Sequence, residues 1–323
     1  MLGWLFTTLA TYVGYVALAV TMWVAVKNVV VPALTRTKLS GQPFKTKRVF
    51  ITGASSGIGK AMALEFCRAG ASVALVARRG DRLAEVEAEC RAIQVEALSG
   101  GVGANPEVVS VVADVGVQAE VEAAVEAAVA ALGGVDVLVA NAGRGSNNVL
   151  FEDEDEEFSL FKAVMDVNYW GVLYCVKAAL PHLVANEGSI LAVSSVAGLV
   201  PTPRRTGYCP TKAALNSFAD SLRYEVGDKV SVTTACPGYV MTEIHNEFMA
   251  ATGAKRNTEK FLTADVAAQR MITALLNRDE TFVMVPTVSF IPILKLILPQ
   301  FLLSKLIISG SESAFTKMSK KQK

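Results

Sequence analysis

The chain has 323 residues, of which 52% are hydrophobic, and its formal net charge is +1 at pH 7. This length suits one large α/β domain or two small ones, and the balanced charge argues against a nucleic-acid-binding protein. Its five cysteines show neither paired nor metal-ligand spacing, which favours a reducing compartment and leaves little support for a disulfide framework or a metal site.

The N-terminal segment is the most apolar part of the chain. Residues 1–26 carry no charged side chain and could cross about 30 Å of hydrocarbon as a helix, so we predict a transmembrane anchor over 1–27. A cleaved signal peptide is the alternative, but it would have a basic start and a shorter apolar core. The linker over 28–46 is basic, and no acidic residue precedes Glu65. The flanking charges therefore predict a body that faces the cytosol.

From residue 47 to residue 286, short apolar runs alternate with stretches long enough for crossover helices, which is typical of a parallel sheet covered on both faces. Seven buried strands are predicted, at 48–52, 72–77, 108–112, 135–140, 189–194, 230–235 and 281–285. The sequence therefore predicts an α/β fold of the doubly wound, Rossmann type with a seven-stranded parallel sheet and no second domain.

A glycine-rich turn, TGASSGIG at 52–59, joins the first predicted strand to a helix. The amides of such a turn can hold a dinucleotide pyrophosphate only where side chains leave room, and the glycines provide that room. The spacing is G-x-x-x-G-x-G, so the evidence lies in its place between strand and helix. The expected cofactor contacts here are Thr52, Gly53, Ser55, Ser56, Gly57, Ile58 and Gly59.

The second predicted strand ends in Ala77, Arg78 and Arg79. Ala77 cannot accept hydrogen bonds from a ribose diol, whereas both arginines offer cationic forks suited to a 2′-phosphate. This favours NADP(H) over NAD(H), with Arg78 as the arginine expected to face the pocket. The alternative is that both arginines merely solvate the start of a helix.

Six motifs occur in order between residues 52 and 242. They are TGASSGIG, NAG (141–143), VNYWG (167–171), SSVAG (194–198), YCPTK (208–212) and PGYVMT (237–242). Together they resemble the motif set of the short-chain dehydrogenase/reductase family. The resemblance implies an oxidoreductase with a nicotinamide cofactor, and homodimerisation through the helices that carry Asn168 and Tyr208.

Tyr208 and Lys212 are four residues apart, so they share one face of a helix. A free phenol, with a pKa of about 10, exchanges protons poorly near neutral pH, whereas a nearby ammonium stabilises the phenolate. The family resemblance implies that Tyr208 exchanges a proton with the substrate oxygen. It also implies that Lys212 lowers the pKa of Tyr208 and contacts the nicotinamide ribose.

The resemblance completes a tetrad with Ser195, which would polarise the substrate carbonyl, and Asn168, which would hold a water behind the lysine. Ser194 is the alternative serine, although we expect it to point to the other side of its strand. The family pattern also implies further cofactor contacts at Asp114, Asn141, Ala142, Gly143, Pro237, Gly238, Val240 and Thr242.

The C-terminal region, 287–323, is apolar but is interrupted by prolines and lysines, so we predict an interfacial segment on the bilayer followed by a basic tail. A hydrophobic subunit interface is the alternative. The final KKQK resembles a dilysine retrieval signal, although a frayed basic tail has the same sequence. With the anchor, it predicts a single-pass protein of the endoplasmic reticulum membrane with a cytosolic catalytic domain.

Within the family, the anchor, the VNYWG and PGYVMT variants and the apolar tail are most similar to the membrane-bound dehydrogenase/reductase member 7 group, especially its 7B branch. Hydroxysteroid dehydrogenases of the 11-beta type are near relatives of that group. This resemblance implies a lipophilic substrate such as a steroid, a retinoid or a long-chain lipid. The alternatives are a 3-ketodihydrosphingosine-type reductase and a membrane-tethered cofactor-binding scaffold without turnover.

Overall fold

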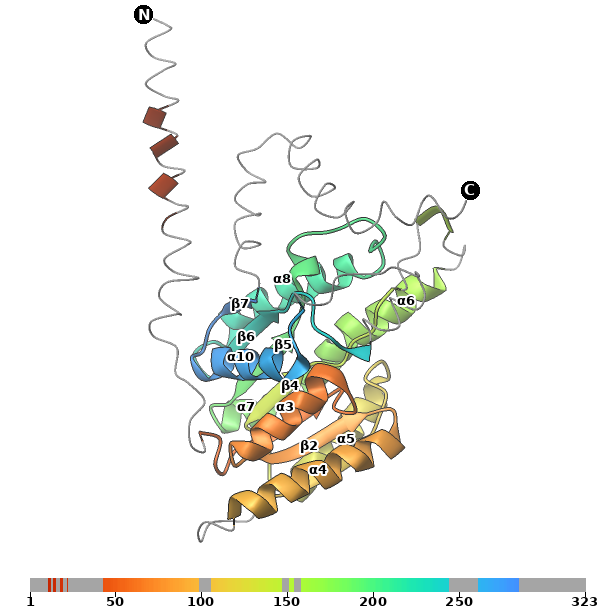
Figure 1. Cartoon of the computed structure of the whole chain (residues 1–323), viewed down its shortest axis with the longest axis vertical. Coiled ribbons are helices and arrows are strands. Elements are labelled where there is room, and N and C mark those ends of the chain that lie inside the picture. The colour runs from red at the N-terminus through yellow and green to blue at the C-terminus, as the bar shows by residue number, and fades with distance from the viewer. Residues whose placement is uncertain are drawn as a thin grey trace, which may run out of the picture.

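The computed structural model describes residues 43–98, 106–146, 151–153, 158–243 and 261–284, together with isolated helical residues between positions 11 and 22. Seven strands form one sheet in the order β3-β2-β1-β4-β5-β6-β7, and each neighbouring pair is parallel (Figure 1). The strands are β1 (Arg48–Thr52), β2 (Ser72–Ala77), β3 (Val108–Val112), β4 (Val137–Ala140), β5 (Ser189–Val193), β6 (Ser231–Cys236) and β7 (Thr281–Val283). The predicted Rossmann-like α/β fold with a seven-stranded parallel sheet is confirmed.

Helices cover both faces of this sheet. One face carries α3 (Gly57–Arg68), α4 (Gly80–Leu98) and α10 (Ala264–Leu276), and the other carries α5 (Gln118–Leu132), α7 (Gly171–Ala185) and α8 (Cys209–Val226). Shorter elements are η2 (Phe151–Asp153), α6 (Ser159–Met165), η3 (Asp166–Trp170) and η4 (Val196–Gly198). Because the chain winds outward from β1 to β3 and then returns to β4, the switch point of the sheet lies between β1 and β4.

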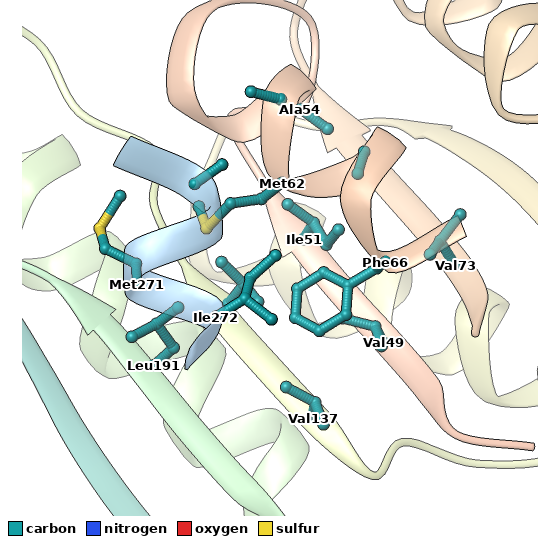
Figure 2. Packing of buried hydrophobic residues seen from close by; sticks show 14 of the residues in the cluster. Val49, Ile51, Ala54, Met62, Phe66, Val73, Val137, Leu191, Met271 and Ile272 are labelled. Carbon is teal, nitrogen blue, oxygen red and sulfur yellow. The ribbon is translucent and has the colours of Figure 1, made fainter. Parts of the chain in front are cut away.

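The two faces of the sheet bury separate hydrophobic clusters, because successive strand side chains point in opposite directions. On β1, Val49 and Ile51 pack with Met62 and Phe66 of α3 in one cluster, whereas Phe50 belongs to the other. Figure 2 shows the first cluster closed by helix α10. This double burial explains why the central strands appear in the sequence as continuous apolar runs.

Strand β3 departs from the prediction of strands buried on both faces. It is an edge strand in the described sheet, and Val112 at its end is 63% exposed. An edge strand has one neighbour and weaker helix cover, which the apolar run VVSVV does not reveal. The predicted strand at 135–140 starts at Val137 instead.

The ion pair between Arg48 and Asp136 ties the first residue of β1 to the start of β4. Asp136 Oδ2 accepts from Arg48 Nε at 2.7 Å and from the Arg48 amide at 2.8 Å. Burial acts to raise the pKa of Asp136, but the hydrogen bonds from Arg48 outweigh it and the pKa is lowered. The pair therefore holds together the amino ends of the two strands whose carboxyl ends flank the switch point.

Several predictions concern residues outside the described ones. These are most of the anchor over 1–27, the linker over 28–46 as far as residue 42, and the tail over 287–323. In the described part of the chain, no helix has both the length and the apolar character needed to cross a membrane.

Candidate active site

A cavity of about 570 Å³ opens at the carboxyl ends of the strands, around the switch point between β1 and β4. Its walls come from the segments that follow β1 to β6 and from the start of α8. In open α/β sheets this edge is where ligands bind. Most predicted site residues line the cavity, whereas Thr52 and Asn168 lie behind its wall.

The glycine-rich turn is shaped for close approach to a ligand. Gly53 and Gly57 have φ of +67° and +55°, conformations that favour glycine. A Cβ on Gly59 would overlap the carbonyl oxygen of Gly53 and lie 2.5 Å from Asn141 Nδ2. At the start of α3, the side chain of Ser56 makes no capping hydrogen bond. The turn therefore fits the pyrophosphate of a dinucleotide, whose oxygens would accept from the amides of the turn and of the helix start.

Thr52 positions the loop after β4 against this turn. Its Oγ1 accepts from the amides of Asn141 and Ala142, at 3.0 and 3.1 Å, and donates to the carbonyl of Val139. Asn141 Nδ2 returns a bond to the Thr52 carbonyl at 2.9 Å. Thr52 is thus a positioning residue, and Asn141 of the NAG motif joins β1 and β4 at the switch point.

The two arginines after β2 take different roles. Arg78 Nη1 lies 3.5 Å from Asp114 Oδ2, and the Arg78 side chain is 64% exposed. Arg79 Nη2 donates to Ser55 Oγ at 3.1 Å and to Ser56 Oγ at 2.9 Å. Both arginines line the cavity, but it is Arg79 that bonds to the glycine-rich turn. The sequence analysis favoured Arg78 as the arginine that faces the pocket. The sequence does not show in which direction each of two consecutive side chains points.

Ser195 and Tyr208 meet where β5 ends and α8 begins. Ser195 Oγ accepts from the Ala197 amide at 3.1 Å and shares a hydrogen bond with the side chain of Tyr208. Ser194 Oγ instead donates to the Lys212 carbonyl at 3.2 Å, so it ties β5 to α8. Ser195, and not Ser194, is therefore the serine that lies beside the Tyr208 side chain.

Tyr208 caps α8 and precedes its first residue, whereas the sequence placed it on the helix. The Lys212 amide still bonds to the Tyr208 carbonyl at 3.3 Å, so the spacing of four residues brings both side chains to the same cavity. Lys212 Nζ lies 6.0 Å from the centroid of the Tyr208 ring and donates to the Val193 carbonyl at 2.9 Å.

The electrostatics of this pair differ from the expectation. Burial raises the pKa of Tyr208, opposed by the charge of Arg205 and by the hydrogen bond with Ser195. Lys212 is not among the groups that shift the pKa of Tyr208, and burial lowers the pKa of Lys212 itself to about 8. Near neutral pH the phenol therefore keeps its proton.

Asn168 lies in the π-helical turn η3, between α6 and α7, and is fully buried. Its Oδ1 accepts from the Arg144 amide at 2.8 Å, and its Nδ2 donates to the Arg144 carbonyl and to Thr211 Oγ1. Thr211 Oγ1 donates in turn to the Tyr208 carbonyl at 2.8 Å. Single π turns often mark functional sites. Here the turn directs Asn168 to bind the cavity wall and the cap of α8 together.

The family model described as short chain dehydrogenase matches residues 47–253, which include the glycine-rich turn and all four predicted catalytic residues. The chain belongs to this family. It is an oxidoreductase related to the 11-beta-hydroxysteroid dehydrogenases. Family members use NAD(H) or NADP(H), and the cavity fits a cofactor of this kind.

Named relatives and solved structures agree with this assignment. The chain is 39% identical to 11-beta-hydroxysteroid dehydrogenase 1A of Arabidopsis thaliana, over 61% of this chain and 53% of that one, so it spans about half the length of that relative. It is 36% identical to 11-beta-hydroxysteroid dehydrogenase-like 4A of the same organism, over 80% and 83%. A Thermococcus sibiricus alcohol dehydrogenase complexed with 5-hydroxy-NADP matches with TM-score 0.63 and 30% identity, over 74% and 95%.

Three charged residues that line the cavity were not predicted from the sequence. Arg205 and Arg144 line the cavity, and the guanidinium carbon of Arg205 lies 5.5 Å from the centroid of the Tyr208 ring. Glu243 lines the cavity at its other end and pairs with Arg79. The only sequence signal for Arg205 and Glu243 was their proximity to a motif of the family. Arg205 lies three residues before Tyr208, and Glu243 directly follows Thr242.

Proposed function

We propose that this short-chain dehydrogenase is a membrane-anchored, NADP(H)-dependent enzyme that reduces the carbonyl of a lipophilic substrate or oxidises the corresponding hydroxyl. One observation carries the proposal. The cavity that holds the glycine-rich turn and Arg79 also holds Ser195, Tyr208 and Lys212 at its other end. A single bound dinucleotide can therefore contact Arg79 with its adenosine end and place its nicotinamide beside Tyr208, the proton donor to the carbonyl.

The residues divide the chemistry among them. The bound nicotinamide supplies the hydride. Ser195 Oγ and the Tyr208 hydroxyl bind the carbonyl oxygen, which becomes more negative as hydride arrives, and Tyr208 gives it a proton. Arg205 places positive charge near the phenolate that remains, which stabilises it. Lys212 lines the same cavity, where it would contact the nicotinamide ribose. Asn168 keeps the start of α8 in place through Thr211.

The preference for NADP(H) is supported by charge at the adenosine end. Ala77 offers no acceptor for a ribose 2′-hydroxyl, while Arg78 and Arg79 both line the cavity there. The similar alcohol dehydrogenase was solved with an NADP derivative, although another similar structure contains NADH. The argument from charge is therefore the stronger one.

A steroid or a comparable lipid is the substrate class that the relatives favour. The relatives that match 80% of this chain are named 11-beta-hydroxysteroid dehydrogenase-like 4A and 4B. That name describes the relatives, and proteins of the same fold act on many different substrates. We therefore propose the coarser class, a carbonyl or hydroxyl on a lipophilic skeleton such as a steroid, a retinoid or a long-chain lipid.

The first test is NADPH consumption by the purified full-length chain with steroid ketones, retinal and long-chain 3-keto lipids. We expect turnover of at least one of these with NADPH, and weaker turnover with NADH because of Arg78 and Arg79. Equal rates with both cofactors would contradict the cofactor preference. NADPH binding without turnover of any carbonyl would favour the scaffold hypothesis.

We also propose a cytosolic orientation on the endoplasmic reticulum membrane. It rests on the apolar segment over 1–26, the basic flank behind it and the terminal KKQK. In sealed microsomes, protease should digest the body and a C-terminal epitope tag without detergent. Digestion that begins only after detergent is added would place the body in the lumen and contradict this orientation.

A further inference from the structure

A carboxylate occupies the arginine cluster at the adenosine end of the cavity. Glu243 Oε2 accepts from Arg79 Nη1 at 2.9 Å, and Glu243 Oε1 accepts from Arg82 Nη1. The other terminal nitrogen of Arg79 bonds to the hydroxyls of Ser55 and Ser56. Glu243, Arg79 and the two serines all line the cavity. An anion is thus already bound by the guanidinium that the cofactor would use.

The position of Glu243 is set by packing against the glycine-rich turn. A Cβ on Gly57 would lie 3.3 Å from Cγ2 of Thr242, so the chain just before Glu243 rests directly on that turn. Arg82 lies on α4, one turn beyond the bend that carries Arg79. The carboxylate is therefore held from two sides, by Arg79 in the bend after β2 and by Arg82 on α4. It lies in the segment that follows β6 and lines the cofactor cavity.

The carboxylate is charged at neutral pH. Burial acts to raise the pKa of Glu243, but hydrogen bonds from Arg79, Arg82 and Ser56 outweigh it and the pKa is lowered. The carboxylate is 39% exposed, so its attraction to the arginines is partly screened by solvent. It is a displaceable partner, and its charge repels any second anion that approaches Arg79.

We propose that Glu243 is a built-in competitor for the 2′-phosphate of the cofactor. In the cofactor-free enzyme its carboxylate holds Arg79, and it gives up that contact when a 2′-phosphorylated cofactor binds. The proposal rests on the NADP(H) preference proposed above. It makes Glu243 a specificity-determining residue, because the competition weakens NADP(H) binding and leaves NAD(H) binding nearly untouched. It also couples cofactor binding to the chain that follows β6.

The test compares two probes that differ only in the 2′-phosphate, adenosine 2′,5′-bisphosphate and adenosine 5′-monophosphate. Their binding to the purified full-length chain is measured by calorimetry, with wild type and with Glu243→Gln. The glutamine keeps the size of the side chain and removes its charge. We expect the variant to bind the bisphosphate about tenfold more tightly, and the monophosphate within about twofold of wild type, since the removed charge lies next to Arg79.

Glu89→Gln is the matched control. Glu89 pairs with Lys60 at 2.8 Å across α3 and α4, and neither residue lines the cavity, so its change should leave both probes unaffected. Unchanged or weaker bisphosphate binding in Glu243→Gln would overturn the proposal, because the carboxylate would then only order Arg79. Loss of monophosphate binding would also overturn it, by assigning Glu243 to the ribose hydroxyls. Wild-type NADPH binding no tighter than NADH binding refutes the cofactor preference separately.

Discussion

Tyr208→Phe is expected to lower kcat by about 10²- to 10⁴-fold while NADPH binding stays within about twofold, since the hydroxyl is the proton donor and the ring keeps its packing. The phenol keeps its proton near neutral pH, because burial raises its pKa. Its hydroxyl also shares a hydrogen bond with Ser195, so the variant removes a donor from the carbonyl site. Single-turnover oxidation of bound NADPH, together with binding by NADPH fluorescence, measures the two effects separately.

Tyr224→Phe is the control for this variant. Tyr224 lies on the same helix, α8, but its side chain is 91% exposed and outside the cavity. It should retain wild-type turnover. If Tyr208→Phe kept more than about a tenth of the wild-type kcat, another group would be the acid, and the assignment of Tyr208 would be wrong.

Gly59→Ala is expected to destabilise the fold and to abolish cofactor binding. Alanine favours a helix by about 1 kcal/mol over glycine, but here the added Cβ would overlap the Gly53 carbonyl and press on Asn141 Nδ2. Backbone atoms cannot move aside as a flexible side chain can, so we expect a net loss of about 1–3 kcal/mol in the free energy of unfolding. Urea unfolding and NADPH fluorescence test the two parts.

Gly80→Ala provides the comparison for Gly59→Ala. Gly80 is the first residue of α4, and a Cβ there would meet only the end of the Val112 side chain, at 3.1 Å. Because Val112 is largely exposed and can rotate, Gly80→Ala should change stability by less than about 1 kcal/mol and leave cofactor binding intact. Equal stability for both alanine variants would show that the close approach at Gly59 is not a constraint.

The sequence by itself determined the parts of this protein whose signal is local. Central strands buried on both faces appear as short apolar runs, so most of β1, β2, β5 and β6 could be located to within a residue or two. The glycine-rich turn carries its own geometric requirement, and Ser195 and Ser194 separate by strand alternation alone. These features need no knowledge of what packs against them.

The tertiary structure decided the features that depend on partners distant in the chain. Arg79 pairs with Glu243 at a separation of 164 residues and also bonds to the glycine-rich turn. Asn168, in a π turn that no local sequence pattern predicts, bonds to Arg144 at a separation of 24 residues. The pKa of Tyr208 likewise depends on burial and on its neighbours in the site. Folding brings together segments that are distant in the sequence, and these segments set the direction, burial and charge of each side chain in the site. The sequence therefore predicts which residues belong to the site better than it predicts what each of them contacts.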